Sequence, residues 1–158
     1  MIVVEVEVEA DAWLEALPEV EALAREAAEA AALSDGAEAD GDYVVLLTDD
    51  AAVAKLNAEF RGKAGSTNVL SFPAASSAAP HRGDVALAFG VCAAEAQAQC
   101  KTLAAHLQHL VVHGVLHLLG FDHHEDDEAE AMEGRERQVL ASLGVGDPYV
   151  LDAAGNAR

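Results

Sequence analysis

The apolar segment from Leu103 to Leu119 constrains the fold of this chain more than any other feature. Its length and spacing predict a helix that lies largely in the core. His113 and His117 are four residues apart within it, and a turn of about 100° per residue places both imidazoles on one face. Gly120 follows, and glycine readily adopts the left-handed conformation that ends a helix. The chain can then turn back and bring His123 towards the other two histidines.

This arrangement of histidines predicts a metal site at the end of the central apolar helix. Three neutral imidazoles with a fourth position left open are typical of catalytic rather than structural zinc. We therefore expect His113, His117 and His123 to bind one zinc ion per chain. The spacing is that of the metzincin motif H-E-x-x-H-x-x-G-x-x-H, but Gly114 stands where those peptidases carry their catalytic glutamate. The alternative is a set of buried histidines bonded to the backbone.

The other four histidines are given no ligand role. On the predicted helix, His106 and His109 fall within about 80° of the two helical ligands. Each could be a partner of a ligand, a substrate contact, or part of a half-buried polar seam. His124 follows the third predicted ligand on a chain that turns away, so we expect it to point elsewhere. His81 lies in a predicted loop and is expected to be solvated.

Four blocks of sequence carry a resemblance to a known family. Residues 113–123 read H-G-V-L-H-L-L-G-F-D-H, and residues 60–73 contain R-G-K followed by T-N-V-L-S-F-P. Gly83-Asp84-Val85 is the third block, and residues 125–133 read E-D-D-E-A-E-A-M-E. In order and spacing these blocks resemble the YbeY-type endoribonucleases, which are bacterial rRNA maturation factors. The resemblance covers residues 40–148, with Phe121 where tyrosine is usual.

The resemblance implies a function and its partners. It implies a single-strand-specific, metal-dependent endoribonuclease that acts in maturation of the 3′ end of small-subunit (16S) rRNA and in ribosome quality control. The expected partners are single-stranded RNA, an rRNA precursor, and the small ribosomal subunit or proteins associated with it. Two alternatives stay open: a metzincin-like metallopeptidase, and a ribosome-assembly factor with a structural metal.

Arg61 and His113 are the candidate catalytic residues. Zinc lowers the pKa of its water and polarises a phosphoryl oxygen, and a guanidinium offsets the charge that builds on the other phosphoryl oxygens. The resemblance assigns that second role to Arg61. Lys63 is a weaker candidate for phosphate contact. Asn68 and Ser71 are expected to fix the strand beside the cleft, while Asp84 either orients a ligand histidine or caps a turn.

The charge of the chain is unusual for a protein that handles RNA. Its 28 acidic and 9 basic residues give a net charge of −19, whereas phosphate binding normally requires a basic surface. Arg61, Lys63 and Arg82 fall in the two segments that the resemblance places near the metal. The acids concentrate in residues 15–38 and 125–136. We therefore expect a local basic cleft on an acidic body; the acids of the second group either face a protein partner or form a solvated helix face.

Length and composition indicate one domain, residues 1–158. No apolar stretch approaches the length of a membrane span, and the N-terminus has neither a basic region nor an apolar signal core. We therefore expect a cytoplasmic protein with no membrane partner. Cys92 and Cys100 lie eight residues apart in a predicted helical segment without zinc-finger spacing, which is typical of reduced thiols.

The order of the predicted elements indicates the fold class. Strands are expected at residues 2–9, 43–47, 68–72 and 85–89, helices at 12–33, 50–60, 91–100, 103–119 and 126–143, and loops at 34–41 and 74–82. Strands that precede a helical C-terminal half favour an α+β fold, a small mixed four-stranded sheet covered by about five helices.

Overall fold

The computed structural model describes residues 1–122 and 124–149, which form an α+β fold with four strands and six α-helices. The strands are β1 (Ile2–Val8), β2 (Gly41–Thr48), β3 (Val69–Pro73) and β4 (His81–Ala88). The helices are α1 (Asp11–Ala16), α2 (Val20–Leu33), α3 (Asp50–Arg61), α4 (Phe89–Ala98), α5 (Leu103–Leu118) and α6 (Asp126–Ser142). Two short 3₁₀ helices, η1 (Gly36–Ala39) and η2 (Ser76–Ala78), lie in the loops. The predicted fold class is confirmed.

The four strands form one mixed sheet in the order β1-β2-β4-β3. β1, β2 and β4 run parallel, whereas β3 pairs antiparallel with β4 and forms the edge. Val85 on β4 has a partner on each side, since it pairs with Val45 on β2 and with Ser71 on β3. Ser71 and its neighbours on β3 therefore lie at an accessible edge of the sheet.

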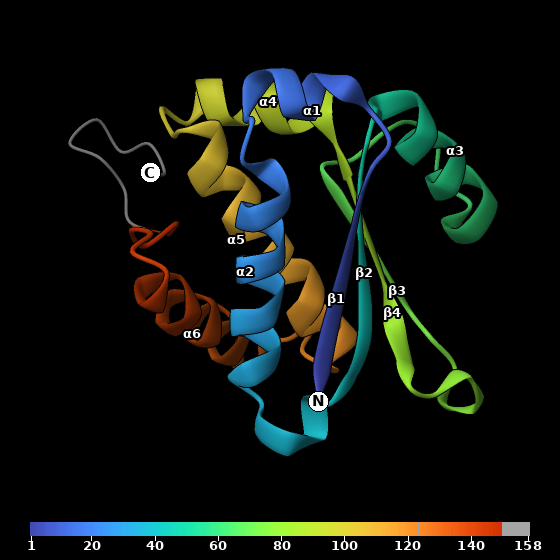
Figure 1. Cartoon of the computed structure of the whole chain (residues 1–158), viewed down its shortest axis with the longest axis vertical. Coiled ribbons are helices and arrows are strands. Elements are labelled where there is room, and N and C mark those ends of the chain that lie inside the picture. The colour runs from blue at the N-terminus through green and yellow to red at the C-terminus, as the bar shows by residue number, and fades with distance from the viewer. Residues whose placement is uncertain (123, 150–158) are drawn as a thin grey trace.

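The two faces of the sheet are covered unequally (Figure 1). On one face, the alternating residues Tyr43, Val45 and Leu47 are buried in the main core under α2 and α5. The other face carries a much smaller core, made by Leu70 and Ala86 against Val53 of α3. Figure 1 shows α3 on that side of the sheet, with α2, α5 and α6 on the opposite side. Part of the second face is left open beside α3.

Helix α5 is the central helix of the main core, as its apolar sequence predicts. Val111, Val112, Val115 and Leu116 are fully buried against α2 and the sheet. The helix ends at the predicted glycine: Gly120 has φ +98°, the Gly120 N–H donates to the carbonyl of His117 and the Phe121 N–H to that of Leu116. These two bonds form a Schellman motif, which satisfies carbonyls that the helix end would otherwise leave unpaired.

Two of the differences from the predicted boundaries have clear local causes. The expected helix 12–33 is interrupted, because Pro18 disfavours helical geometry in Leu17, whose backbone is extended at φ −136°. The described residues therefore form six α-helices, where the sequence predicts about five. The expected loop 74–82 ends early, because β4 begins at His81, where pairing with Asp42 of β2 satisfies its backbone.

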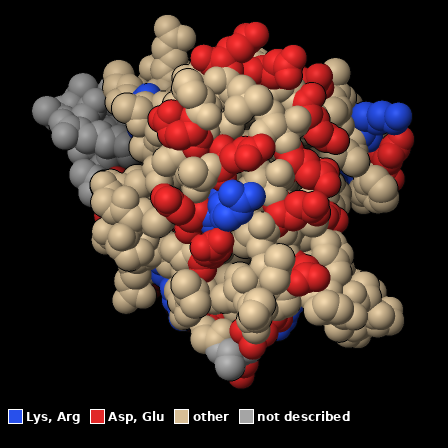
Figure 2. Space-filling view, viewed as in Figure 1, with Lys and Arg blue, Asp and Glu red and all other residues tan. Residues whose placement is uncertain are grey.

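Charge and cysteine placement follow the prediction in outline. Acidic side chains dominate the face seen in Figure 2, and few basic ones lie among them. Cys92 is buried in α4, and Cys100 is exposed just beyond that helix; both thiols are free. Burial raises the pKa of the Cys92 thiol to about 12, with Glu95 and Asp50 adding to the shift. Within the described ranges, no helix is both long and apolar enough to cross a membrane.

Candidate functional site

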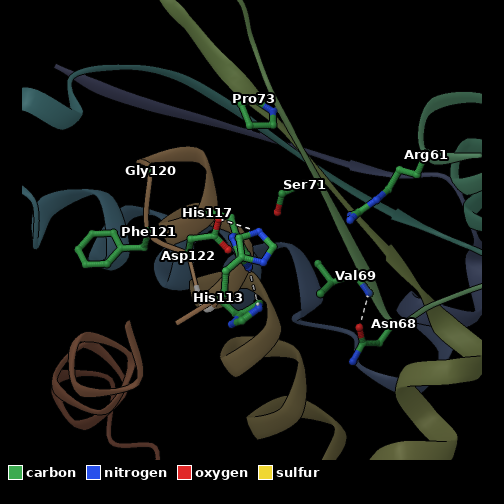
Figure 3. A pocket seen from close by; sticks show the side chains of 11 residues that line it. Arg61, Asn68, Val69, Ser71, Pro73, His113, His117, Gly120, Phe121 and Asp122 are labelled. Atoms are coloured by element: carbon green, nitrogen blue, oxygen red, sulfur yellow. Dashed lines mark hydrogen bonds and ion pairs between the residues drawn. The ribbon is translucent and has the colours of Figure 1, made fainter. Parts of the chain in front are cut away.

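A pocket of about 440 Å³ lies between the C-terminal half of α5, the edge strand β3 and the end of α3 (Figure 3). Helix α5 contributes His113 and His117, and β3 contributes residues that face the same side of the sheet. The lining consists of Arg61, Asn68, Val69, Ser71, Pro73, His113, His117, Gly120, Phe121, Asp122 and His124. Segments about fifty residues apart in the sequence therefore meet at one hollow.

His113 and His117 form a pair with defined proton positions. Nδ1 of His113 lies 2.5 Å from Oε1 of Glu136, a fully buried residue of α6. An ionised carboxylate can only accept, so Nδ1 of His113 is the donor, and in the neutral imidazole its Nε2 then carries the lone pair. That Nε2 lies 3.1 Å from Nε2 of His117. Glu136 therefore fixes the tautomer in which His113 presents an unprotonated nitrogen towards His117.

Glu136 is held in its ionised form by its neighbours. Burial raises the pKa of this carboxyl, but hydrogen bonds from His109, His113 and Tyr149 outweigh that effect and lower the pKa to about 2. The Tyr149 hydroxyl donates to Oε2 of Glu136, and Nε2 of His109 lies 3.3 Å from the same hydroxyl. Burial and the bond to Glu136 raise the pKa of Tyr149. A buried polar network thus links α5 to α6.

The two histidines fit the donor geometry of a zinc site. Two nitrogens at about 2.0–2.1 Å from a tetrahedral zinc ion are roughly 3.3 Å apart, close to the 3.1 Å between the two Nε2 atoms. The Glu136 contact is the kind of outer partner that orients metal-bound histidines. His123, the third predicted ligand, lies outside the described residues. Within the ranges 1–122 and 124–149, no group of three or more potential ligands is close enough to hold a metal ion.

Arg61 approaches the pocket from the last turn of α3 and is exposed. In Figure 3 its guanidinium points towards the side of the pocket that holds the histidines. Among the described residues, no carboxylate forms an ion pair with Arg61, despite the acidic composition. The Asn57 side chain donates to the Gly65 carbonyl at 2.9 Å and so fixes the loop that follows α3. The guanidinium is therefore available to an anion in the pocket.

The other two cations of the predicted basic cleft lie elsewhere. Lys63 is exposed and does not line the pocket. Arg82 donates to the backbone carbonyls of Asp40 and Glu38, the former at 2.8 Å. This corrects the expectation that Arg82 contributes to the cleft, because its guanidinium is used to hold the loop before β2. Within the described residues, Arg61 is the one Lys or Arg that lines the pocket.

Ser71 and Asn68 have the structural positions expected of them. The Ser71 hydroxyl donates to the Gly114 carbonyl at 3.0 Å, which ties β3 to α5. The Asn68 amide donates to Glu95 at 3.0 Å, and its oxygen accepts from the Val69 N–H at 2.7 Å. Asp84 lies 3.5 Å from His81. The carboxylate that contacts His113 is Glu136 of α6.

The remaining four histidines have three kinds of position: two lie in a buried polar seam, one lines the pocket and one begins β4. His106 pairs with Glu95 at 3.0 Å, and His109 with Tyr149, so both belong to a buried seam along α5. Burial lowers the pKa of His106, although Glu95 opposes the shift. His124 corrects the prediction: it lines the pocket and lies 3.1 Å from Asp122. His81 begins β4 and is half-buried, not a solvated loop residue.

Glu136 is the site residue that the sequence interpretation missed. It belongs to the acidic run 125–136, which is expected to face a protein partner or to form a solvated helix face, yet it is fully buried. A signal was present: Met132, Glu136 and Leu140 recur every four residues, so Glu136 falls on the apolar stripe of its helix. A carboxylate on such a stripe indicates a buried partner.

Gly114 is required by packing between α5 and the sheet. A Cβ at this position would lie 2.6 Å from Cγ1 of Val85 and 3.2 Å from Oγ of Ser71. The side chain of a glutamate here would therefore be directed into the sheet and not into the pocket. The peptidase base is absent for a structural reason, since the close approach of α5 leaves room for glycine alone.

Fold and site together define a class of protein: an α+β domain with a histidine pair and an arginine on one pocket. Comparison with known proteins is more specific. Residues 7–144 match the model of the family described as Endoribonuclease YbeY. A protein of that name from Maricaulis maris is 52% identical over 149 residues, 94% of this chain and 92% of the relative. Another from Azorhizobium caulinodans is 51% identical over 158 residues, 96% and 99% of the two chains.

The chain therefore belongs to the Endoribonuclease YbeY family. This confirms the resemblance seen in the sequence blocks. The solution structure of TM1509 from Thermotoga maritima superimposes with a TM-score of 0.56 at 24% identity, covering 91% of this chain and 92% of that one. At this identity the likeness supports the fold alone.

Proposed function

We propose that residues 1–158 form one metal-dependent endoribonuclease domain that cuts single-stranded RNA. In this proposal His113, His117 and His123 hold one zinc ion, and Arg61 and His113 are the catalytic residues. The family membership and the name that its relatives carry support the reaction class. The observation that carries the proposal is that Arg61 and the two described histidines line one pocket.

The residues of this chain divide the work of phosphodiester cleavage. The Arg61 guanidinium donates paired hydrogen bonds to phosphoryl oxygens as their negative charge grows. Glu136 accepts from Nδ1 of His113 and so leaves the lone pair of the neutral imidazole on Nε2, the nitrogen that would bind the ion. The histidines would hold a zinc ion, which would supply Lewis acidity at the pocket when bound. Ser71 fixes the distance between β3 and α5, and so the width of the pocket.

Neither alternative function has an observation in its favour. A metallopeptidase needs a carboxylate base next to its first histidine, and a side chain at Gly114 would be directed into the sheet. A structural metal needs a closed set of ligands, whereas the two described histidines border an open pocket with an arginine. The nuclease explains both the histidines and the guanidinium.

We further propose the cellular role that the family implies. The chain would act in the cytoplasm on rRNA precursors, in maturation of the 3′ end of 16S rRNA and in ribosome quality control. Its net charge of −19 disfavours general attraction to RNA. Specificity would then come from a few contacts in the pocket and from the small ribosomal subunit or its associated proteins. The isolated protein should be a slow and unselective nuclease.

The first test separates phosphate stabilisation from metal binding. Arg61→Ala is expected to retain its metal and to cut a single-stranded oligonucleotide roughly 100- to 1000-fold more slowly, the usual effect of losing one charge-stabilising donor. Arg61→Lys should be intermediate, because an ammonium keeps the charge but loses the paired geometry. The measurements are single-turnover cleavage rates and metal content of the same preparations.

Lys55→Ala is the matched control for that test. Lys55 is an exposed cation on the same helix, and it does not line the pocket. Its removal should change the rate less than about threefold, since surface charges away from the site act only through screened, long-range attraction. Full cleavage by Arg61→Ala would refute the role of Arg61.

The second test concerns Glu136. Glu136→Gln should lower the affinity for zinc by about 10- to 100-fold, because the partners of metal-bound histidines fix their tautomer and basicity. Competition with a chelator measures this directly. Glu95→Gln is the control, since it alters the similar pair with His106, and neither His106 nor the second partner of Glu95, Asn68, is a predicted ligand. Equal zinc affinity in wild type and Glu136→Gln, with both proteins folded, would contradict the prediction.

A further inference from the structure

A second hollow, of about 700 Å³, lies on the other face of the sheet beside α3. Its wall is apolar where Leu46, Leu56, Phe60 and Phe72 meet, and Asp84 lies at its border. This is the part of the second sheet face that α3 leaves uncovered. The main core is on the opposite side of the sheet, so the hollow is not a packing defect of that core.

The second hollow is continuous with the pocket of the histidines. Arg61, Ser71 and Pro73 line both. The boundary is the edge strand β3, in which successive side chains point to opposite faces. Ser71 therefore faces α5 and the histidines, whereas Phe72 faces α3. A chain that passes around this edge would contact both hollows, with Arg61 at the junction.

Phe60 presents an exposed aromatic ring to the second hollow. It is 67% exposed, and within the described residues it is the one exposed aromatic side chain. Its ring meets that of Phe72 edge to face, with centroids 5.6 Å apart and an interplanar angle of 66°. The contact with Phe72 holds the ring in place, and the exposure shows that much of the ring surface is not covered. A fixed, exposed aromatic ring is a platform on which nucleobases stack.

We propose that this hollow is a nucleobase subsite of the nuclease: a base next to the phosphate at Arg61 stacks on Phe60. The inference rests on the proposed function. The phosphate and the base of neighbouring nucleotides are then recognised by adjacent residues, Phe60 and Arg61. The Asp84 carboxylate disfavours a phosphate in the second hollow and can accept from the N–H groups of a base.

This subsite accounts for a preference for single strands. A base can stack on Phe60 only if it has left its own helical stack, which an unpaired nucleotide does at little cost. Stacking is tolerant of sequence because every base has a π face. The subsite therefore favours single-stranded over double-stranded RNA without favouring a particular base. It also adds affinity for RNA without adding positive charge to an acidic protein.

The test compares three substitutions at Phe60 on a single-stranded RNA oligonucleotide. Phe60→Ala should raise KM by about 5- to 100-fold, as expected for the loss of one stacked base, with metal content unchanged. Phe60→Leu keeps an apolar side chain but loses the ring, so it should behave like Phe60→Ala. Phe60→Trp should retain wild-type KM. An oligonucleotide with 2-aminopurine beside the cleavage site should change its fluorescence on binding to wild type and Phe60→Trp, but not on binding to Phe60→Ala or Phe60→Leu.

Leu33→Ala is the matched control, because Leu33 is also 67% exposed but lies at the end of α2. This substitution should leave both KM and the fluorescence response of the 2-aminopurine oligonucleotide as in the wild type. If Phe60→Leu behaves like wild type, the contact is merely apolar and the stacking proposal is overturned. A change of oligomeric state in Phe60→Ala, with unaltered KM, would overturn it in favour of a second copy of the chain. Absence of RNA cleavage by wild type would instead refute the proposed function.

Discussion

His117→Ala is expected to abolish both the stabilisation of this protein by zinc and its cleavage of RNA. The His117 and His113 Nε2 atoms are 3.1 Å apart at the pocket, so the substitution removes one of two described donors. Loss of the hydrogen-bond partner of a metal-bound histidine already lowers the affinity for the metal by about 10- to 100-fold, and loss of the histidine itself should lower it further. Cleavage should fall to background, because no remaining group replaces the ion.

Thermal unfolding with and without zinc measures the effect independently of activity. Zinc at about 100 times its dissociation constant should add about 2.7 kcal/mol to the free energy of unfolding of the wild type. The same concentration should add nothing measurable to His117→Ala. His81→Ala is the control, since that histidine begins β4 outside the pocket lining and pairs with Asp84 at 3.5 Å. A zinc response retained by His117→Ala would contradict the assignment.

The parts of the site that could be predicted from sequence depend on local geometry. The helical spacing of His113 and His117 and the left-handed turn at Gly120 are properties of about ten consecutive residues. Both are confirmed as structural features. The position of Arg61 at the same pocket depends on contacts between segments that are far apart in the sequence. It could be predicted only from the family resemblance.

The parts that could not be predicted depend on which elements pack together. Glu136 reaches His113 because α6 packs against α5, and no local pattern specifies that contact. Arg82 lies on β4, which begins earlier than predicted. Its guanidinium therefore reaches the carbonyls of Glu38 and Asp40 and does not line the pocket. His124 lines the pocket, whereas the spacing of the sequence alone places it on a chain that turns away.

Gly114→Glu would introduce the glutamate of the peptidase motif, and we expect it to prevent folding instead of creating a peptidase. A Cβ at Gly114 already lies 2.6 Å from Cγ1 of Val85, so the longer side chain would enter a packed layer. Burial of an unpaired carboxylate costs several kcal/mol beyond the overpacking. Typical domains have only about 5–15 kcal/mol of stability. The measurement is circular dichroism with thermal denaturation, which should show loss of the cooperative transition.

Alanine substitutions grade this effect and separate it from helix propensity. Alanine is about 1 kcal/mol more favourable than glycine within a helix. At Gly134 of α6 a Cβ would meet nothing within 4 Å, so Gly134→Ala should be stabilised by about that amount. At Gly114 the overpacking of about 1–3 kcal/mol should outweigh the gain, so Gly114→Ala should be destabilised. If both variants gained stability, close packing would not explain why glycine occupies position 114.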